Sequence, residues 1–382
     1  MQFVHISDNH LGYRQYNLDE RERDFYNNFN ECIDKILEIK PDFVVHSGDL
    51  FEKHSPNIAA IHTAIKGFLK LKEKNIPIYM IHGNHDIPNR KYKKSPFVIL
   101  KSILGDYLRT FTKRNYHIFE KNGKEIFIAG SDYTKKEYMD NLFEKYRSIE
   151  KESKDYKKKI LIFHQSISYY TDIPLSDLQI SDFPKGFDYY AGGHIHDRAL
   201  TFANNGNGKQ SVLGYAGSTE LRSRKEYDGY LQNGKGFYLV DMSGKDFDLN
   251  DIQKIDLKCR EFIIDKTVKN EYDLNLLMEE VKRKNNPIVF ARVRRDYLEN
   301  LRSFLDNNTL YNKITLLDEI TEELDIESKT IDELFREYIQ LKNYDEELIY
   351  GIYGNVLENN DIGKYLKDYF EKCWYNNDND IK

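Results

Sequence analysis

Cysteine is scarce in this sequence. The 382 residues contain three cysteines, Cys32, Cys259 and Cys373, which lie far apart and include no Cys-x-x-Cys pair. An odd and dispersed set of cysteines excludes a disulfide framework and a zinc finger, and it is typical of a reduced intracellular protein.

Long apolar runs are absent as well. No stretch approaches the roughly 20 residues that a membrane-spanning helix needs, and the chain starts with a strand-like segment instead of a signal peptide. We therefore expect a soluble, cytoplasmic protein.

The net charge is small but unevenly distributed. The formal charge of the chain is −6, and residues 321–382 alone contain 16 acidic and 7 basic residues, which leaves a balance of +3 for residues 1–320. The acidic excess favours a protein partner for this last segment rather than DNA. The length, more than twice the roughly 150 residues of an average domain, predicts two or three domains.

Five apolar segments in the first two hundred residues end at side chains that can bind a metal ion. The segments are residues 3–7 before Asp8 and His10, 42–47 before Asp49, 76–82 before Asn84, 159–163 before His164, and 187–193 before His194 and His196. The ligand-binding loops of α/β proteins follow the carboxyl ends of parallel strands. We therefore expect these seven side chains to converge in one crevice.

Other segments repeat their apolar residues at helical spacing. Such segments predict helices over residues 25–37, 57–74 and 96–104, and a charged, solvated helix within residues 135–159. Residues 116–120 and 125–129 flank an Asn-Gly dipeptide, which predicts a β-hairpin. Strands that alternate with helices indicate an α/β structure centred on sheets.

A plausible domain boundary lies at Ser243-Gly244-Lys245-Asp246. Beyond it we expect a small α+β unit with strands near residues 262–264, 287–293 and 314–317 and helices at 273–284 and 297–307.

Three amphipathic helical segments follow in the last part of the chain. A short tail can barely bury so much aromatic surface by itself, so these segments are expected to dock on a partner. The candidate contact residues are Leu334, Phe335, Tyr338, Ile349, Tyr353, Tyr365, Tyr369 and Phe370.

Taken singly, each candidate ligand has an ordinary explanation. Asp49 after a glycine can cap a helix, and a histidine at a strand end is more often a hydrogen-bonded structural residue. Together, the seven groups are too many to satisfy one another cheaply, and neighbouring carboxylates repel without cations. Oxygen and nitrogen donors without thiolate suit Mn²⁺, Fe or Zn²⁺, and ligand hardness favours Mn²⁺.

Asp49 is the natural bridge between two such ions, because it lies between the ligands of the first strand and those of the later strands. Two ions about 3.5 to 4 Å apart activate a water nucleophile and stabilise charge on a phosphoryl group.

The motifs resemble those of a known superfamily. The series Asp8-Asn9-His10, Gly48-Asp49, Gly83-Asn84-His85-Asp86, His164 and Gly193-His194-Ile195-His196 resembles the calcineurin-type metallophosphoesterases. Within that superfamily, Asp8-Asn9-His10-Leu11-Gly12-Tyr13 and Gly48-Asp49-Leu50-Phe51 are similar to motifs of the Mre-eleven (SbcD) nucleases of DNA double-strand-break repair.

This resemblance implies an α/β fold in which a calcineurin-like metallophosphoesterase β-sandwich is flanked by helices. It also implies a small α+β cap domain and a helical C-terminal tail. We assign residues 1–243 to the nuclease domain, 244–318 to a DNA-capping domain, and 319–382 to a tail that binds an ATPase.

The resemblance also implies the roles of the site residues. Asp8, His10, Asp49 and His196 would hold one Mn²⁺, and Asp49, Asn84, His164 and His194 the other. His85 would be the acid that stabilises or protonates the leaving oxygen. The implied activity is that of a Mn-dependent 3'-5' exonuclease and single-strand or hairpin endonuclease.

One position departs from the family pattern. The family often has a histidine directly after the Asp-Leu-Phe motif, whereas this chain has Glu52 there and His54 two residues later.

The implied partners are DNA, a second copy of the chain, and a Rad-fifty-type SMC-like ATPase that binds the tail, which together imply a nucleoid-associated protein. Dimerisation is expected through helices near residues 58–69 and 96–104. The candidates for contact with the DNA backbone are Tyr13, Arg14, Arg90, Lys91, Lys93, Lys94, Arg222 and Arg224. The alternative for these basic residues is a solvated surface role.

Two other functions fit parts of the sequence. A phosphatase or a small phosphoesterase could use the same fold, but the Asp-Arg-Gly extension that Ser/Thr phosphatases carry in the second motif is replaced by Glu52-Lys53-His54. A metal-free scaffold could recruit the ATPase, but a scaffold has no reason to keep seven mutually repelling polar groups together.

Overall fold

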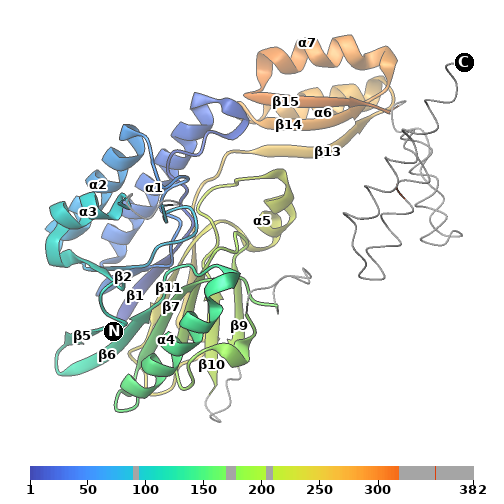
Figure 1. Cartoon of the computed structure of the whole chain (residues 1–382). Coiled ribbons are helices and arrows are strands. Elements are labelled where there is room, and N and C mark those ends of the chain that lie inside the picture. The colour runs from blue at the N-terminus through green and yellow to red at the C-terminus, as the bar shows by residue number, and fades with distance from the viewer. Residues whose placement is uncertain (89–93, 169–177, 204–209, 318–348, 350–382) are drawn as a thin grey trace, which may run out of the picture.

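Two six-stranded sheets pack face to face, and a small three-stranded sheet lies at one end of this sandwich (Figure 1). The computed structural model describes residues 1–88, 94–168, 178–203, 210–317 and residue 349. The strand orders are β12-β11-β1-β2-β3-β4, β5-β6-β7-β8-β10-β9 and β13-β14-β15. The predicted α/β class is confirmed.

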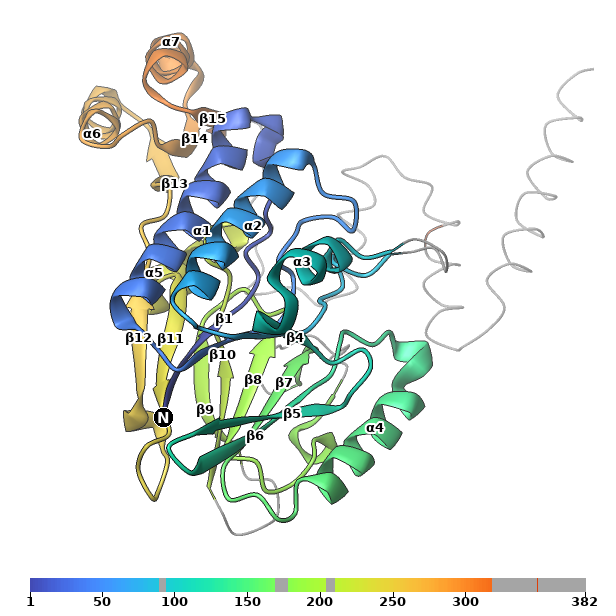
Figure 2. The same ribbon diagram turned by 90° about the vertical axis from the view of Figure 1, so that its left-hand side faces the viewer.

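The first sheet combines four parallel strands with an antiparallel pair. The strands are β1 Gln2–Ile6, β2 Phe43–His46, β3 Ile78–Met80, β4 Leu108–Thr110, β11 Gly236–Asp241 and β12 Ile252–Asp256. Its outer face packs against helices α1 Asp19–Ile39, α2 Ile58–Glu73 and α3 Phe97–Leu104 (Figure 2). The predicted helices over 25–37, 57–74 and 96–104 are thereby confirmed, with α1 starting earlier than expected.

The second sheet packs against the face of the first sheet that the helices do not cover. Its strands are β5 Tyr116–Lys121, β6 Lys124–Gly130, β7 Lys159–His164, β8 Tyr189–Gly193, β9 Ala199–Ala203 and β10 Ser211–Tyr215, and α4 Met139–Glu152 covers its outer face. The predicted hairpin is confirmed as β5 and β6, with Asn122 and Gly123 at positive φ. The charged helix is shorter than residues 135–159, because α4 covers only Met139–Glu152 and Lys159 already belongs to β7.

Aromatic and β-branched side chains fill the space between the two sheets. The ring of Phe3 in β1 stacks on Phe43 at a centroid distance of 5.0 Å and meets the edge of Tyr189 from the second sheet at 5.7 Å. All four residues of β2 are buried, as expected for a parallel strand covered on both faces. The packing holds the carboxyl ends of strands from both sheets at one edge of the sandwich.

The small unit contains β13 Phe262–Val268, α6 Glu271–Lys282, β14 Ile288–Val293, α7 Leu298–Asn308 and β15 Tyr311–Leu316. The types and order of these elements agree with the sequence prediction. Both strand pairs are parallel, so each helix is a crossover connection. However, β12 follows the boundary expected at residue 243 and still pairs with β11, so the stretch up to Asp256 belongs to the first sheet.

The remaining regular elements are short. They are α5 Tyr227–Asn233 and the 3-10 turns Gln15–Asn17, Gly105–Tyr107, Lys136–Tyr138, Ile180–Asp182, Arg224–Glu226, Leu249–Asp251 and Arg295–Tyr297. The predicted tail helices and their contact residues lie outside the described residues, except Ile349. Within the described part of the chain, no helix is both long and apolar enough to cross a membrane.

Candidate metal centre

Five loops meet where the strands of the two sheets end. Those after β1, β2 and β3 come from the first sheet, and those after β7 and β8 come from the second. The structure brings together all seven side chains that the sequence predicts as ligands. Each of them lies within 4.0 Å of at least one other member of the set. The ring or carboxylate of Asp8, His10, Asp49 and His164 is almost completely buried.

The backbone of these loops is strained at the candidate ligands themselves. Asp8, His10, Asp49 and His194 have φ values of 51°, 46°, 52° and 87°. Residues other than glycine rarely adopt positive φ, and such strain is common at functional sites. At Gly83 a Cβ atom would overlap Oδ1 of Asp49, so only glycine allows this carboxylate to reach its position.

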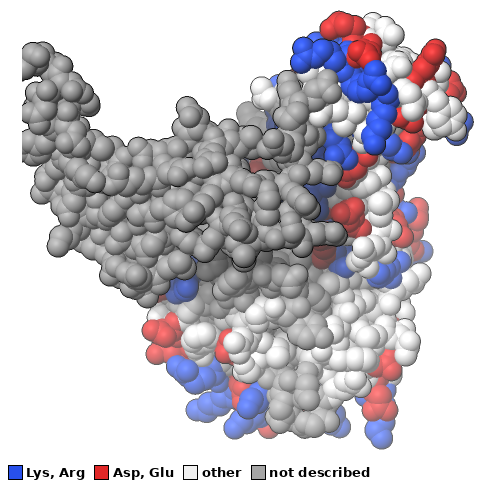
Figure 3. Space-filling view, turned by 90° about the vertical axis from the view of Figure 1, so that its right-hand side faces the viewer, with Lys and Arg blue, Asp and Glu red and all other residues white. Residues whose placement is uncertain are grey.

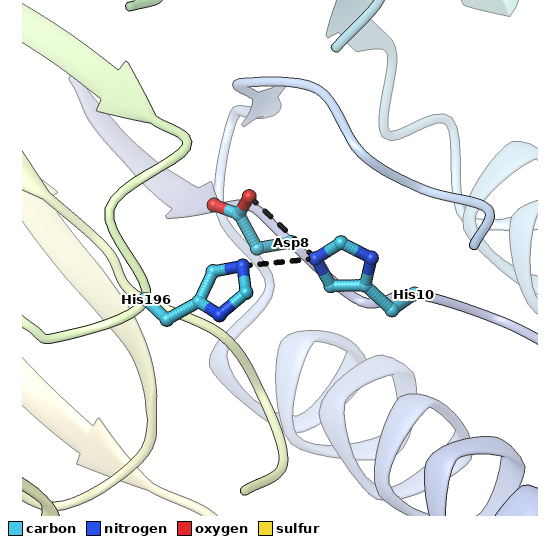
Figure 4. A group of neighbouring side chains, drawn as sticks. All are labelled: Asp8, His10 and His196. Atoms are coloured by element: carbon cyan, nitrogen blue, oxygen red, sulfur yellow. Dashed lines mark hydrogen bonds and ion pairs between the residues drawn. The ribbon is translucent and has the colours of Figure 1, made fainter. Parts of the chain in front are cut away.

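The first group of ligands is Asp8, His10 and His196 (Figure 4). Nε2 of His10 lies 3.1 Å from Nε2 of His196 and 4.0 Å from Oδ1 of Asp8. Two ring nitrogens that face each other at this distance need a positive centre between them, which is either a shared proton or a cation. Asp49 Oδ2, at 3.9 Å from His10 Nε2, joins the same group.

Asp49 is shared with a second group. Its Oδ2 lies 3.3 Å from Nε2 of His164. The side-chain oxygen of Asn84 lies 3.1 Å from the same nitrogen of His164 and 3.0 Å from Nδ1 of His194. Asp49 therefore occupies the position between the two groups that a bridging ligand requires.

The electrostatics of the site favour added positive charge. Burial lowers the pKa of the His164 ring, but the carboxylates of Asp49 and Asp8 outweigh burial and raise this pKa to about 9. Burial raises the pKa of Asp49, and the neighbouring His164 reverses the effect and brings it well below its usual range. With two carboxylates, one amide, four imidazoles and no thiolate, the donor set fits divalent Mn, Fe or Zn.

In three of the four histidines, an oxygen atom lies close to the ring nitrogen that faces away from the site. Nδ1 of His164 donates to the carbonyl of Ser47 at 2.7 Å, and Nδ1 of His196 donates to Glu226 at 2.9 Å. Glu52 Oε2 lies 3.0 Å from Nδ1 of His10. Such acceptors fix the tautomer and leave Nε2 free for a metal ion.

Glu226 belongs to a buried polar network. Nζ of Lys235, which is 1% exposed, donates at 2.8 Å to Glu226 Oε2, to the hydroxyl of Ser218 and to the carbonyl of His196. Burial raises the pKa of the Glu226 carboxyl, but the hydrogen bond from His196 and the charge of Lys235 lower it well below its usual range. The carboxylate behind His196 therefore stays ionised.

Sequence reasoning missed the roles of Glu52 and Glu226. The place of Glu52 directly after the Asp-Leu-Phe motif was a signal, because the family often has a histidine there. No local signal marks Glu226. His54 is in none of the metal-binding groups found among the described residues.

His85 differs from the ligands in its orientation. Its backbone N–H donates to Asp49 Oδ1 at 2.9 Å, and its Nδ1 donates to the carbonyl of Glu52 at 2.7 Å. Nε2 is therefore free and lies 4.0 Å from Asp49 Oδ2. The side chain is 25% exposed, so it can reach a bound substrate.

Three of the candidate DNA contacts are paired with carboxylates. Arg14 pairs with Asp19 at 2.8 Å, Arg222 with Glu52 at 2.9 Å, and Arg224 with Asp265. The guanidinium of Arg222 also lies over the ring of Tyr13 at 4.9 Å. Lys94 is exposed, and Arg90, Lys91 and Lys93 lie outside the described residues.

Comparison with known proteins agrees with this site. Residues 1–198 match the family model of the calcineurin-like phosphoesterases, which gives the class of the fold and of its site. The chain is 51% identical over 378 residues to "DNA double-strand break repair protein Mre11" of Methanococcus maripaludis, covering 97% of this chain and 99% of the relative. It is 43% identical over 376 residues to the protein of the same name from Methanocaldococcus jannaschii, covering 97% and 98%. The chain belongs to the Mre11 family of calcineurin-like phosphoesterases, which confirms the resemblance seen in its motifs.

Proposed function

We propose that this protein is a Mn²⁺-dependent nuclease that hydrolyses phosphodiester bonds of DNA during double-strand break repair, as a 3'-5' exonuclease and as an endonuclease on single strands and hairpins. The observation that carries the proposal is the meeting of seven ligand side chains around Asp49. The names of the relatives support DNA as the substrate.

In this proposal Asp8, His10, Asp49 and His196 hold one Mn²⁺, and Asp49, Asn84, His164 and His194 hold the other. Two bound ions would neutralise phosphoryl charge and supply a nucleophile by lowering the pKa of water. Asn84 contributes a neutral oxygen, so the second site keeps more positive charge for the phosphate.

His85 carries a proton to the leaving oxygen. The Glu52 carbonyl fixes Nδ1 as the donor, which leaves Nε2 as the atom that holds the mobile proton. Glu52 and Glu226 orient the two histidines of the first site.

The test is cleavage of end-labelled duplex and hairpin DNA in Mn²⁺ by the wild type and by His85→Ser. The variant should cut about 10²- to 10⁴-fold more slowly, the usual contribution of a general acid, while it still binds Mn²⁺ and DNA. His54→Ser is the matched control, because His54 lies in no metal-binding group of the described residues.

Parallel assays separate the alternatives. Hydrolysis of bis-p-nitrophenyl phosphate without DNA cleavage would favour a small phosphoesterase. Full DNA cleavage by His85→Ser would show that His85 is not the acid, and a wild type that hydrolyses neither DNA nor the ester would favour the scaffold.

We also propose three parts for the chain, with the first boundary moved past β12. Residues 1–257 form the nuclease domain, 258–318 the cap and 319–382 the tail. Basic side chains lie beside acidic ones on the small unit at the top of the face in Figure 3. Arg224, Arg292 and Lys313 line a hollow there together with Asp265, which supports a cap that lies over DNA.

Exposed apolar side chains on α2 and α3 support a homodimer. Ile58 is 86% exposed, and Val98, Ile99 and Ile103 are 50%, 44% and 37% exposed. The two helices pack side by side (Figure 2), and grouped apolar exposure of this kind marks an interaction surface. Docking of the tail on a Rad-fifty-type ATPase is supported by its amphipathic pattern and its acidic charge.

A further inference from the structure

The edge that carries the metal centre continues beyond β3 to β4. The two strands are parallel, with Tyr79 beside Arg109 and Met80 beside Thr110. The chain therefore leaves β4 on the same edge at which the loop with Asn84 leaves β3. In place of metal ligands, the segment after β4 carries Thr112-Lys113-Arg114.

This segment lines two adjoining hollows in the surface. Both are lined by Lys101, Arg109, Lys113, Arg114 and His117. The larger hollow has a volume of about 940 Å³ and also contains Asp106 and Glu152. The other reaches His82, the residue before Gly83-Asn84 in the chain. The elements that supply these residues, α3, β4, β5 and α4, are seen together in Figure 2.

The segment after β4 is anchored on both sides of its two basic residues. Phe111 is 2% exposed and packs on Gly130, where a Cβ atom would overlap the phenyl ring. The amide of Gly130 donates to the carbonyl of Asn115 at 3.1 Å, and Nε2 of His117 donates to the carbonyl of Thr110 at 3.0 Å. Lys113 and Arg114 thus project into solvent from a fixed backbone.

Part of the positive charge of this surface is compensated, because Nζ of Lys101 lies 3.9 Å from Oδ1 of Asp106. Among the described residues, Lys113 and Arg114 form no ion pair, in contrast with the paired Arg14, Arg222 and Arg224. Arg109 donates to the hydroxyl of Tyr79 at 2.9 Å and to a carbonyl, which are both neutral acceptors.

The ring of His117 responds to this charge. Burial lowers the pKa of His117, and the charges of Arg109, Arg114 and Lys101 lower it further, against the hydrogen bond to Thr110.

We propose that this surface, which we call the β4 groove, binds the sugar-phosphate backbone of the DNA strand that extends from the metal centre, with Lys113 and Arg114 contacting its phosphates. The proposal rests on the proposed nuclease function. Backbone contacts of this kind do not depend on sequence, and they hold the strand in position relative to the reacting bond. A groove on the same edge of the sheet as the metal centre suits a polymer, because a small phosphoester would extend no further than the metal centre itself.

The test uses the full chain with His85→Ser, so that DNA stays intact during binding. Lys113→Gln with Arg114→Gln removes the two charges, and Lys124→Gln with Lys245→Gln is the matched control. Both control lysines are exposed, and they lie at the opposite edge of the sheets, at the start of β6 and after β11. Fluorescence anisotropy in Mn²⁺ gives the affinity for labelled single-stranded and duplex DNA between 50 and 200 mM NaCl.

We expect the groove variant to bind DNA at least tenfold more weakly at 50 mM NaCl, while the control retains wild-type affinity. The slope of log K against log salt should become less steep by about 0.7 to 0.9 for each phosphate contact that is lost. Thermal unfolding of both variants checks that they are folded.

A second measurement does not depend on the variants. DNA bound in the β4 groove would neutralise the cations around His117, so its pKa, followed by NMR, should rise when DNA is added. An unchanged pKa of His117 on a saturated complex would overturn the proposal.

The outcomes distinguish this proposal from the one on which it rests. If the wild type neither binds nor cleaves DNA, the proposed nuclease function fails. If the wild type binds and cleaves DNA but the groove variant keeps its affinity and salt slope, the β4 groove is not the binding surface. An equal loss in the control variant would show a general effect of net charge and would also overturn the proposal.

Discussion

Carboxylates behind the histidines hold the geometry of this metal centre. Glu52 is notable because it faces His10, accepts from His85 through its backbone carbonyl, and pairs with Arg222. A metal ligand with an anionic acceptor behind it is both oriented and made more basic. We therefore expect Glu52 to contribute to metal affinity.

Glu52→Gln should weaken the binding of Mn²⁺ by about 10- to 100-fold, the usual cost of losing such an acceptor. Isothermal titration calorimetry with Mn²⁺ measures this directly and without substrate. Glu73→Gln, at an exposed carboxylate near the end of α2, should leave the affinity unchanged. Wild-type affinity in Glu52→Gln would show that Glu52 is only a partner of Arg222.

The contact between α1 and α2 depends on a glycine. A Cβ atom at Gly67 would lie 2.6 Å from Cε1 of Phe29 and 3.0 Å from Cγ1 of Ile33. The missing side chain lets α2 approach α1 closely. Both helices cover the sheet whose strands end at Asp8, Asp49 and Asn84.

Gly67→Ala should therefore destabilise the protein by about 1 to 3 kcal/mol through overpacking. In a helix without this contact, the same change would stabilise by about 0.8 to 1.0 kcal/mol, so the sign of the effect is informative. Urea unfolding gives the free energy. The loss should be smaller in a Phe29→Leu background, where the shorter side chain makes room, and a more stable Gly67→Ala protein would refute the close contact.

The small unit is attached to the larger one by ion pairs, by aromatic contacts and by a buried apolar cluster that joins Leu221 with Phe262, Ile288 and Phe290. Asp24 in α1 accepts from Arg260 at 2.8 and 2.5 Å and from the buried Arg21 at 2.6 Å. Tyr16 stacks on Tyr311 of β15 with ring centroids 3.9 Å apart. These polar and aromatic contacts supplement the apolar cluster in fixing the relative position of the two units.

Asp24→Asn should loosen the cap while the sandwich remains folded, because it removes the charge that faces two arginines. Hydrogen exchange followed by mass spectrometry should show faster exchange in β13–β15 and in the segment around Arg260. Asp34→Asn, at an exposed ion pair with Lys70, is the control. Unchanged exchange in the small unit would mean that the apolar cluster and the aromatic contacts hold it without the charge of Asp24.

Charged substitutions in the exposed apolar surface of α3 test the proposed dimer. Val98→Glu with Ile99→Glu should shift the molar mass in light scattering from that of a dimer to that of a monomer, since a buried unpaired charge is costly. Leu276→Glu, at a 53% exposed position on α6, is the matched control and should not change the mass. A dimer that survives the double variant would place the interface elsewhere.

The sequence alone determined the candidate ligands and the order of most elements. Asp8, Asp49 and Asn84 could be found because each directly follows an apolar strand, and a strand end is a local property of the chain. The helices of the small unit were equally visible in local periodicity.

Tertiary structure decided how distant segments meet. Glu226 reaches His196 across 30 residues, Arg222 reaches Glu52 across 170, and β12 returns to the first sheet after an apparent boundary. It also separated the basic residues into paired ones, such as Arg14, and unpaired ones, such as Lys113. The reason is physical: periodicity reports only which face of an element is buried, whereas these contacts depend on which strands become neighbours when the two sheets pack.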